Sequence, residues 1–228
     1  MTTATPISDE TLTKLRNIPT QTLIDGLWVK GWPSGYIEGA LPLKSGQSMA
    51  GRAVTLRFVP HRPDLAEDKP KREQSAEYVV IELCGPSEVL VIDGMEWKYS
   101  SIGGDLKFMR LMQRKVGGLV TDGGVRDNLV LKDYGFPVYS ASTTTKQGPA
   151  DFWPWQVNDA IVGDDDGVVV VPSSEVDEVI RIAHEREDVE EVIKAQLEVE
   201  NCSPGKYYPF NEATWKLYEE KTGKKRIQ

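Results

Sequence analysis

Three short apolar runs, with two helical stretches between them, constrain most strongly what this chain can fold into. The runs are EVLVIDG at residues 88–94, GGLVTDGGV at 117–125 and FPVYS at 136–140. Residues 105–116 place apolar side chains at 106, 109, 112 and 116, which is a helical period, and a short helix over 126–135 is expected to end at Gly135. Because the connections are short, this alternation of strand and helix predicts parallel βαβ units.

The flanking segments add helices, loops and an antiparallel pair of strands. Residues 159–172, DAIVGDDDGVVVVP, predict a hairpin with a tight Asp/Gly turn, so the sheet is expected to be mixed. After the hairpin comes a long, charged amphipathic helix, whose apolar face packs either on its own domain or on another subunit. The other predicted segments are helices at 7–30, broken at Pro19, and at 75–83, a strand at 51–59, and loops at 31–50 and 61–74.

Composition bounds the possible partners and the compartment. The 228 residues suffice for one large domain, and 39% hydrophobic with 27% charged residues is ordinary for a globular protein. The net charge of -8 argues against nucleic acid as the main partner. No apolar run approaches the 18 residues of a membrane span, so we expect a cytoplasmic protein with no membrane partner. A zinc cluster is not expected, because Cys84, Cys202, His61 and His184 are scattered along the chain.

The first candidate for chemistry is SIGGDLK, residues 101–107, where a Gly-Gly pair runs into a helix that begins at Asp105. The first N–H groups of a helix have no internal partner, and with the helix dipole they form an anion site. Glycine lets a ligand approach the backbone closely. The segment is therefore either a cradle for a carboxylate or a plain glycine turn capped by Asp105.

The second candidate is the neighbouring pair Arg126–Asp127, which follows the next strand at the same edge of the sheet. Arg126 offers a planar fork of donors for a carboxylate, and Asp127 offers oxygen to a hard divalent cation. The alternatives are a surface ion pair or a helix N-cap by Asp127. Together, the two candidates suit a 2-oxo acid, whose keto oxygen and carboxylate can both bind one cation that stabilises an enolate.

The stretch GGDLKFMRLMQRKVGGLVTDGGVRD resembles the signature of the RraA-like family, in which a glycine precedes Arg-Asp by about twenty residues; here 21 residues separate Gly104 from Arg126. GRAVT at 51–55 and DDDGVVVVP at 164–172 also resemble family segments. The resemblance covers about residues 18–200. The family includes class II 4-hydroxy-4-methyl-2-oxoglutarate aldolases and regulators of ribonuclease E activity.

The resemblance implies an α/β fold, a β/β/α swivelling-domain sandwich with a mixed sheet and a C-terminal helical extension, assembled as a homotrimer or hexamer. A single domain would span residues 1–228, with a core at about 18–172 and the extension at about 173–228. It also implies a lyase that releases pyruvate from a 4-hydroxy-2-oxo acid or decarboxylates oxaloacetate. The alternative is a regulator that acts by binding a ribonuclease or another protein without turnover.

The family's site residues map onto this sequence as follows. Asp127 would bind Mg²⁺ or Mn²⁺, and Asp105 would help hold the waters of that cation. Arg126 would hold the 2-oxo acid and neutralise the enolate. Backbone N–H groups of Gly104, Asp105, Leu106 and Lys107 would bind the substrate carboxylate. Glu190, with Glu191 close behind, would reach the site from a neighbouring subunit.

The sequence departs from the family pattern before the final hairpin. There, a strand is shortened or absent, because VN at 157–158 runs almost directly into residue 159. The segment 142–155 is rich in aromatic residues, and Trp153 and Trp155 line either a substrate pocket, an interface or the C-terminal extension.

Overall fold

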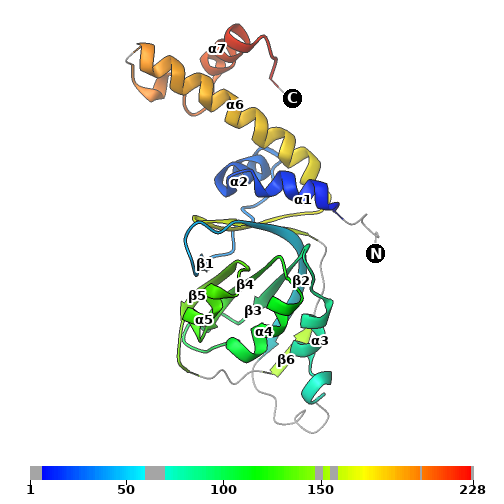
Figure 1. The fold of residues 1–228 in the computed structure, drawn as a ribbon. Coiled ribbons are helices and arrows are strands. Elements are labelled where there is room, and N and C mark those ends of the chain that lie inside the picture. The colour runs from blue at the N-terminus through cyan, green and yellow to red at the C-terminus, as the bar shows by residue number, and fades with distance from the viewer. Residues whose placement is uncertain (1–6, 60–69, 147–150, 155–158, 201, 227–228) are drawn as a thin grey trace.

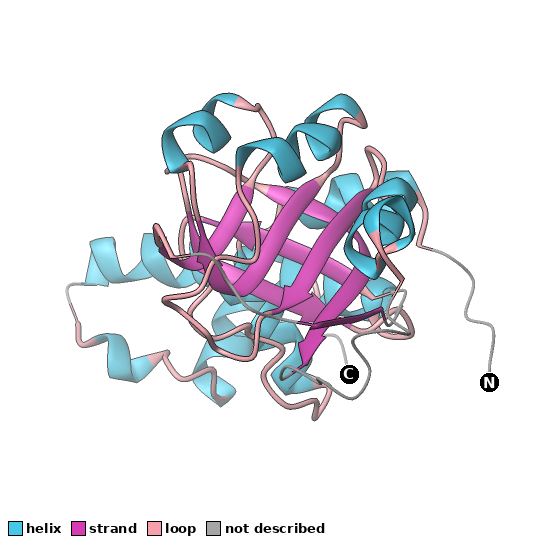
Figure 2. Ribbon diagram, turned by 90° about the horizontal axis from the view of Figure 1, so that it is seen from below, coloured by secondary structure: helices cyan, strands magenta, loops and turns pink. Residues whose placement is uncertain are grey.

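The computed structural model describes residues 7–59, 70–146, 151–154, 159–200 and 202–226, and its strands join in one mixed sheet (Figures 1 and 2). The strand order is β1-β5-β4-β3-β2-β7-β8, and β6 also pairs with β2. The long strand β2 pairs with β7 at its beginning and with β6 at its end. The strands are β1 Leu41–Pro42, β2 Met49–Val59, β3 Glu88–Asp93, β4 Gly118–Val125, β5 Val138–Thr143, β6 Asp151–Pro154, β7 Ala160–Asp164 and β8 Gly167–Val171.

The central strands β2, β3, β4 and β5 run parallel, and β7 and β8 form an antiparallel hairpin, as predicted. A strand of four residues, β6, precedes this hairpin, and the junction at 157–158, where a strand was expected to be shortened or absent, lies outside the described residues. The prediction of a loop over residues 31–50 is wrong in two places. Leu41–Pro42 pairs antiparallel with β5, and β2 begins already at Met49. A strand of two residues is too short to produce an alternating pattern.

The predicted helices are present, with shifted ends. The α4 helix stops at Gln113, three residues before its predicted end, because Lys115 adopts a φ of 56° and the chain then turns Val116 into the core. The helices are α1 Asp9–Arg16, α2 Thr20–Val29, α3 Ala76–Leu83, α4 Asp105–Gln113, α5 Asn128–Asp133, α6 Val176–Glu200 and α7 Glu212–Thr222, with short 3-10 turns η2 Arg72–Gln74 and η3 Pro204–Lys206.

Three hydrophobic clusters separate the layers. The α3, α4 and α5 helices cover one side of the parallel strands, where Phe108 and Leu111 pack on Leu90. The strands β7 and β8 fold over the other side of the parallel strands, and Met49 and Tyr139 lie in the cluster between them. The outer side of that hairpin is covered by α1, α2 and the first half of α6. This layering confirms the predicted α/β class with a mixed sheet, and it adds a second helical layer, formed by α1, α2 and α6, to the predicted β/β/α sandwich.

The α6 helix extends beyond the body of the molecule and carries a separate small cluster. Its second half packs on α7 through Val189, Ile193, Leu217 and Tyr218. We call residues 189–226 the arm, which projects away from the sheet in Figure 1. In the part of the chain that the structure describes, every helix is too short or too polar to cross a lipid bilayer.

Candidate functional site

Backbone hydrogen bonds bring the two predicted turns together. The segment before α4 runs beside the end of β4, where Ile102 N donates to Gly124 O at 2.9 Å and Arg126 N donates to Gly103 O at 3.1 Å. A parallel bridge between Ser101 and Gly124 continues the same pairing. The Gly-Gly turn and the Arg-Asp pair are therefore direct neighbours at the carboxyl edge of the sheet, where open α/β folds bind ligands.

The carboxylate of Asp127 lies at the N-terminus of α4. Asp127 precedes α5 with a φ of 59° and a ψ of 36°, yet its side chain makes no capping bond to α5. Instead, its Oδ2 accepts the N–H of Asp105 at 3.0 Å. The alternative that Asp127 caps its own helix is therefore wrong. The left-handed backbone, which Asp tolerates better than most residues, aims the carboxylate toward the neighbouring turn.

Arg126 and Asp127 form a loose ion pair. Arg126 Nε lies 3.6 Å from Asp127 Oδ2, and the side chains are 44% and 43% exposed. Exposed ion pairs of this kind contribute little to the stability of a fold, so stability alone does not account for the position of Arg126 beside Asp127. Both side chains are accessible to a ligand.

Gly104 provides the space that these two side chains occupy. A Cβ at this position would lie 2.2 Å from Asp127 Oδ2 and 2.6 Å from Arg126 Cγ. Its φ of -157° is ordinary extended backbone, so the position needs glycine for room and not for conformation. The sequence predicted that the Gly-Gly pair lets a ligand approach the backbone, but it did not predict that Gly104 makes room for these two side chains.

The residues that follow Gly104 at the start of α4, which are Asp105, Leu106 and Lys107, differ in the hydrogen bonds that their side chains make. The Asp105 carboxylate accepts a hydrogen bond from the Tyr134 hydroxyl. Leu106 is 85% exposed. Lys107 Nζ donates to the Ile102 carbonyl at 2.9 Å and to the Glu77 carboxylate, with Lys107 only 21% exposed. The amine is therefore already engaged, and the expectation that Lys107 contributes its backbone N–H stays a prediction.

The donor set fits a hard divalent cation held mainly by water. Among residues in the described ranges there is no group of three or more His, Cys, Asp or Glu placed to hold a metal. Mg²⁺ requires fewer protein ligands, because it keeps several waters and binds through one or two carboxylates plus substrate oxygens. Asp127, whose side chain is 43% exposed, and Asp105 supply two carboxylates. Cys84 is no rival ligand, since burial raises the pKa of its thiol to about 12.

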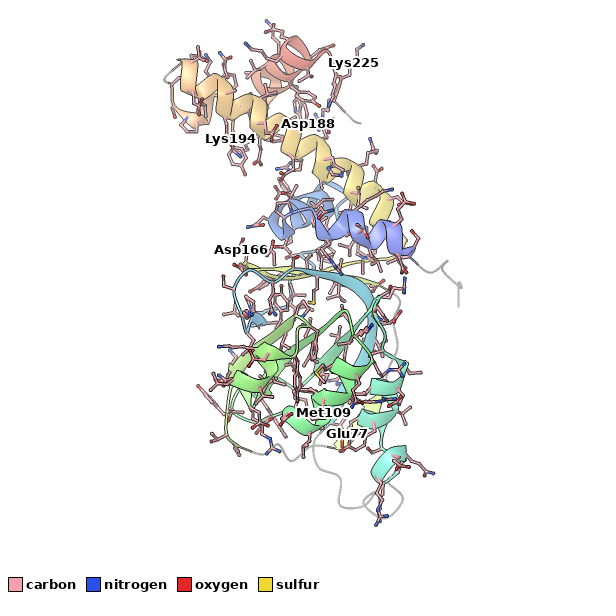
Figure 3. All side chains as sticks on the ribbon, in the orientation of Figure 1. Glu77, Met109, Asp166, Asp188, Lys194 and Lys225 are labelled. Carbon is pink, nitrogen blue, oxygen red and sulfur yellow. The ribbon has the colours of Figure 1, made fainter. Side chains whose placement is uncertain are left out.

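Within one chain, Glu190 does not reach this site. It lies half-buried in the arm, beside Ile193 and Lys194. Figure 3 places Lys194 at the opposite end of the molecule from Glu77 and Met109, which lie near the site. The expectation that Glu190 acts from a neighbouring subunit stays a prediction. Trp155, His61 and the side chain of Trp153 lie outside the described residues, although the backbone of Trp153 belongs to β6.

Two residues beside the site were missed from the sequence. Asp122, in the middle of β4, accepts the N–H groups of Gly94 and Glu96, the latter at 2.8 Å. It holds the turn after β3, where Met95 and Glu96 have left-handed φ values of 57° and 56°. A charged residue inside an otherwise buried strand was the available signal for Asp122. Tyr134 gave none, because its partner Asp105 is 29 positions away.

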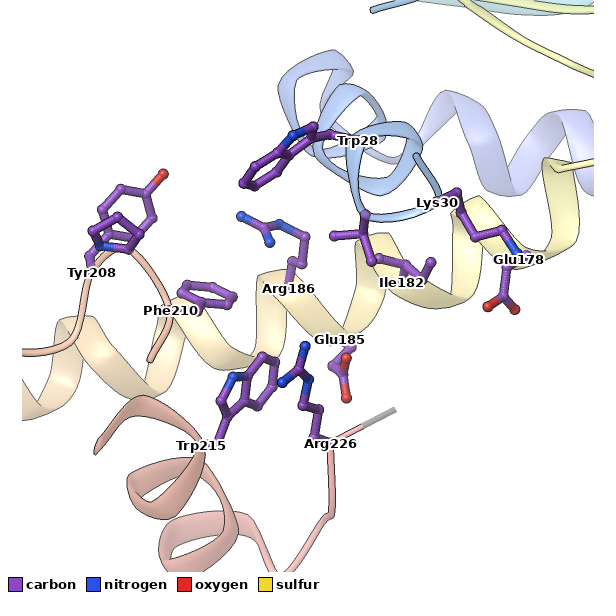
Figure 4. A pocket seen from close by; sticks show the side chains of 12 residues that line it. Trp28, Lys30, Glu178, Ile182, Glu185, Arg186, Tyr208, Phe210, Trp215 and Arg226 are labelled. Atoms are coloured by element: carbon purple, nitrogen blue, oxygen red, sulfur yellow. The ribbon is translucent and has the colours of Figure 1, made fainter. Parts of the chain in front are cut away.

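A cavity lies elsewhere, between α2, α6 and the residues around α7. It measures about 880 Å³, and none of the predicted site residues lines it. Figure 4 shows Trp28, Arg186 and Phe210 around it. Arg186 pairs with Asp25 at 2.9 Å and lies 4.6 Å from the centre of the Phe210 ring.

Comparison with known proteins identifies relatives of the whole core. A model of the RraA-like family, described as Aldolase/RraA, matches residues 20–170. A protein of Halalkalibacterium halodurans named "Putative 4-hydroxy-4-methyl-2-oxoglutarate aldolase" is 28% identical over 188 residues, which cover 77% of this chain and 83% of that protein.

Solved structures share the fold. Streptomyces coelicolor RraAS2, described as an unusual member of the RNase ES inhibitor RraA protein family, aligns with a TM-score of 0.72 and 28% identity over 83% of this chain and 98% of that one. An uncharacterized protein of Pseudomonas syringae aligns with a TM-score of 0.69 and 20% identity over 88% of this chain and 98% of the other. The second likeness concerns the fold alone.

Proposed function

Because the chain belongs to the RraA-like family, as its motifs predicted, we propose that it is a divalent-cation-dependent lyase that forms pyruvate from a 2-oxo acid. The substrate is a 4-hydroxy-2-oxo acid, cleaved by retro-aldol reaction, or oxaloacetate, which is decarboxylated. The observation that carries the proposal is the convergence of Gly104, Arg126 and Asp127 on the N-terminus of α4. The aldolase name of the Halalkalibacterium relative supports it.

The first-turn N–H groups of α4 would bind the carboxylate of the substrate. In the structure Asp127 accepts the first of them, from Asp105, so the substrate carboxylate and Asp127 compete for that donor. We expect the Asp127 side chain to turn away from Asp105 N when the site is loaded. Gly104 leaves room for this movement, because it has no side chain to block the carboxylate.

Asp127, with Asp105 beside it, would hold Mg²⁺ or Mn²⁺. That cation, when bound, supplies a Lewis acid for the keto oxygen. Arg126 would place its guanidinium fork on the same oxygen or on the carboxylate and neutralise the negative charge that develops there. No Schiff base is needed, since the electron sink is the polarised 2-keto group.

The reaction balances without another reactant. In the retro-aldol direction, the 4-hydroxyl loses a proton and the bond between C3 and C4 breaks, which leaves a carbonyl product. The electron pair of that bond enters the enolate of pyruvate, and C3 then gains a proton. In oxaloacetate the same bond breaks, and carbon dioxide leaves in place of the carbonyl product.

A coupled assay for pyruvate tests this proposal. Oxaloacetate and a branched 4-hydroxy-2-oxo acid are supplied with Mg²⁺, with Mn²⁺ or with a chelator. We expect turnover only with the cation, and its loss in both Arg126→Ala and Asp127→Ala. Arg181→Ala is the matched control, because Arg181 is an exposed arginine that pairs with Glu178 on α6. Absence of cation-dependent pyruvate release from every substrate would refute the lyase.

The second candidate is a regulator that binds a ribonuclease or another protein without turnover. The likeness to Streptomyces RraAS2 favours it, because that protein is described as a member of an RNase inhibitor family. A regulator acts through its surface, so Arg126→Ala would leave inhibition of a ribonuclease unchanged. Assembly as a homotrimer or hexamer is expected under either proposal, and sedimentation measures it directly.

A further inference from the structure

Tyr134 reaches the candidate site from the end of a neighbouring helix. It is the residue that ends α5, and Gly135 with a φ of 80° follows it. Its ring lies half-buried, 6.3 Å from the ring of Phe136, on the cluster that α4 and α5 share. Its side chain is therefore fixed by packing, and only the hydroxyl projects toward the first turn of α4.

The hydroxyl meets two oxygens of one residue. It donates to Oδ1 of the Asp105 carboxylate and lies 3.3 Å from the Asp105 carbonyl oxygen. The bond to Asp105, with partial burial and the charges of Asp105 and Asp127, raises the pKa of Tyr134 to about 12. A phenol is in any case protonated at neutral pH, so Tyr134 is the donor in its bond to the Asp105 carboxylate.

Asp105 is thereby held at separate atoms by two side chains. Its N–H donates to Asp127 Oδ2 at 3.0 Å, and its Oδ1 accepts from Tyr134. Tyr134 engages only one of the two carboxylate oxygens, so the other is able to accept a bond from a ligand. A carboxylate on the first turn of a helix would otherwise sample several rotamers, and the tyrosine selects one of them.

We propose that Tyr134 is a positioning residue, whose hydroxyl orients the Asp105 carboxylate toward Asp127 and so sets the affinity of the site for its divalent cation. The inference rests on the proposed function, because it assumes that Asp105 and Asp127 serve one cation. Partners that orient such groups typically change metal affinity by roughly 10- to 100-fold when they are removed. The role is independent of which 2-oxo acid is cleaved.

The test measures Mn²⁺ binding to the full chain by electron paramagnetic resonance, without substrate. Tyr134→Phe keeps the packed ring and removes only the hydroxyl. We expect its dissociation constant for Mn²⁺ to rise about 10-fold. Tyr207→Phe is the matched control, since Tyr207 donates to the Glu200 carboxylate at 2.7 Å in the arm. Its affinity for Mn²⁺ should equal that of the wild type.

A double-mutant cycle separates positioning from a general loss of structure. In an Asp105→Ala background, the Tyr134→Phe change should no longer affect Mn²⁺ affinity, because the group that it orients is gone. In the pyruvate assay, saturating Mn²⁺ should restore most of the turnover of Tyr134→Phe, so the defect lies in cation binding.

Unchanged Mn²⁺ affinity in a folded Tyr134→Phe protein would overturn this inference while leaving the lyase intact. The same holds for a loss of affinity that persists in the Asp105→Ala background. If the wild type binds no Mn²⁺ and releases no pyruvate, the proposed function fails and this inference fails with it. The outcomes are therefore distinguishable.

Discussion

Replacing Gly104 by alanine is the sharpest perturbation of the site, because it adds one methyl group where Arg126 and Asp127 meet. The new Cβ would lie 2.2 Å from Asp127 Oδ2, whereas real Cβ contacts essentially never fall below 3.0 Å. The carboxylate must therefore move by at least 0.8 Å, the difference between the two distances. Arg126 Cγ, at 2.6 Å, must move as well.

A displacement of this size should separate catalysis from stability. Misplacing a reacting group by about 1 Å costs roughly 100-fold in rate, which corresponds to about 2.7 kcal/mol of transition-state stabilisation. The fold should lose only about 1 kcal/mol, the low end for overpacking, because both displaced side chains are exposed and can rotate. The backbone tolerates alanine, since the φ of Gly104 is -157°.

The assay compares kcat/KM in the pyruvate assay with thermal unfolding of the same preparation. Gly205→Ala is the matched control: the nearest atom to its added Cβ is Ser203 Oγ at 3.5 Å, an ordinary contact in the arm. We expect the control to keep both activity and Tm. A folded Gly104→Ala protein with wild-type kcat/KM would refute the idea that Arg126 and Asp127 act together over this glycine.

Three further predictions concern Lys107, Glu200 in the arm, and Glu190 as a residue supplied by a second copy of the chain. Borohydride added with pyruvate should neither inactivate the protein nor label Lys107 in a mass spectrum, because its amine is bonded to neighbouring oxygens and no Schiff base forms. The bond from Lys206 lowers the pKa of Glu200 to about 2, so the stability that it contributes is present above about pH 4.5 and is lost as the pH falls from there to about 2. The protection of α7 amides, corrected for the intrinsic pH dependence of exchange, should fall over that window, and Glu200→Gln should reduce this fall. Refolding Arg126→Ala and Glu190→Gln chains together should restore turnover that neither has alone, and no recovery would remove Glu190 from the site.

The local pattern of the chain was enough to predict the parallel units and the hairpin. The strand Gly118–Val125 is buried along most of its length. The α4 helix was predicted from apolar residues at 106, 109, 112 and 116, but the residues that it buries are Phe108 and Leu111, and Leu106 is 85% exposed. The short strand β1 was missed because its pairing with β5 depends on tertiary contacts and not on its own two residues. Pattern reasoning is strong where an element is long enough to repeat.

The candidate site was predictable only as far as neighbouring turns determine it. That Gly104 and Arg126 share one edge follows from the parallel order of the strands. That the Asp127 side chain reaches α4 instead of capping α5 depends on its left-handed backbone, which the sequence does not encode visibly. The hydrogen bond between Tyr134 and Asp105 was harder still to predict, because it depends on how α4 and α5 pack against each other.

The layer order of the fold decides how the arm can take part in chemistry. The α4 and α5 helices cover one face of the parallel strands, whereas α6 packs on α1 and α2 beyond the β7–β8 hairpin (Figure 1). The sheet therefore stands between Glu190 and Arg126 of the same chain, and no change of rotamer brings them together. A glutamate on this helix completes a site only in a second copy, so the lyase with Glu190 requires assembly. A regulator that acts without turnover does not need a glutamate from a second copy. Recovery of turnover when Arg126→Ala and Glu190→Gln chains are refolded together would therefore favour the lyase over the regulator.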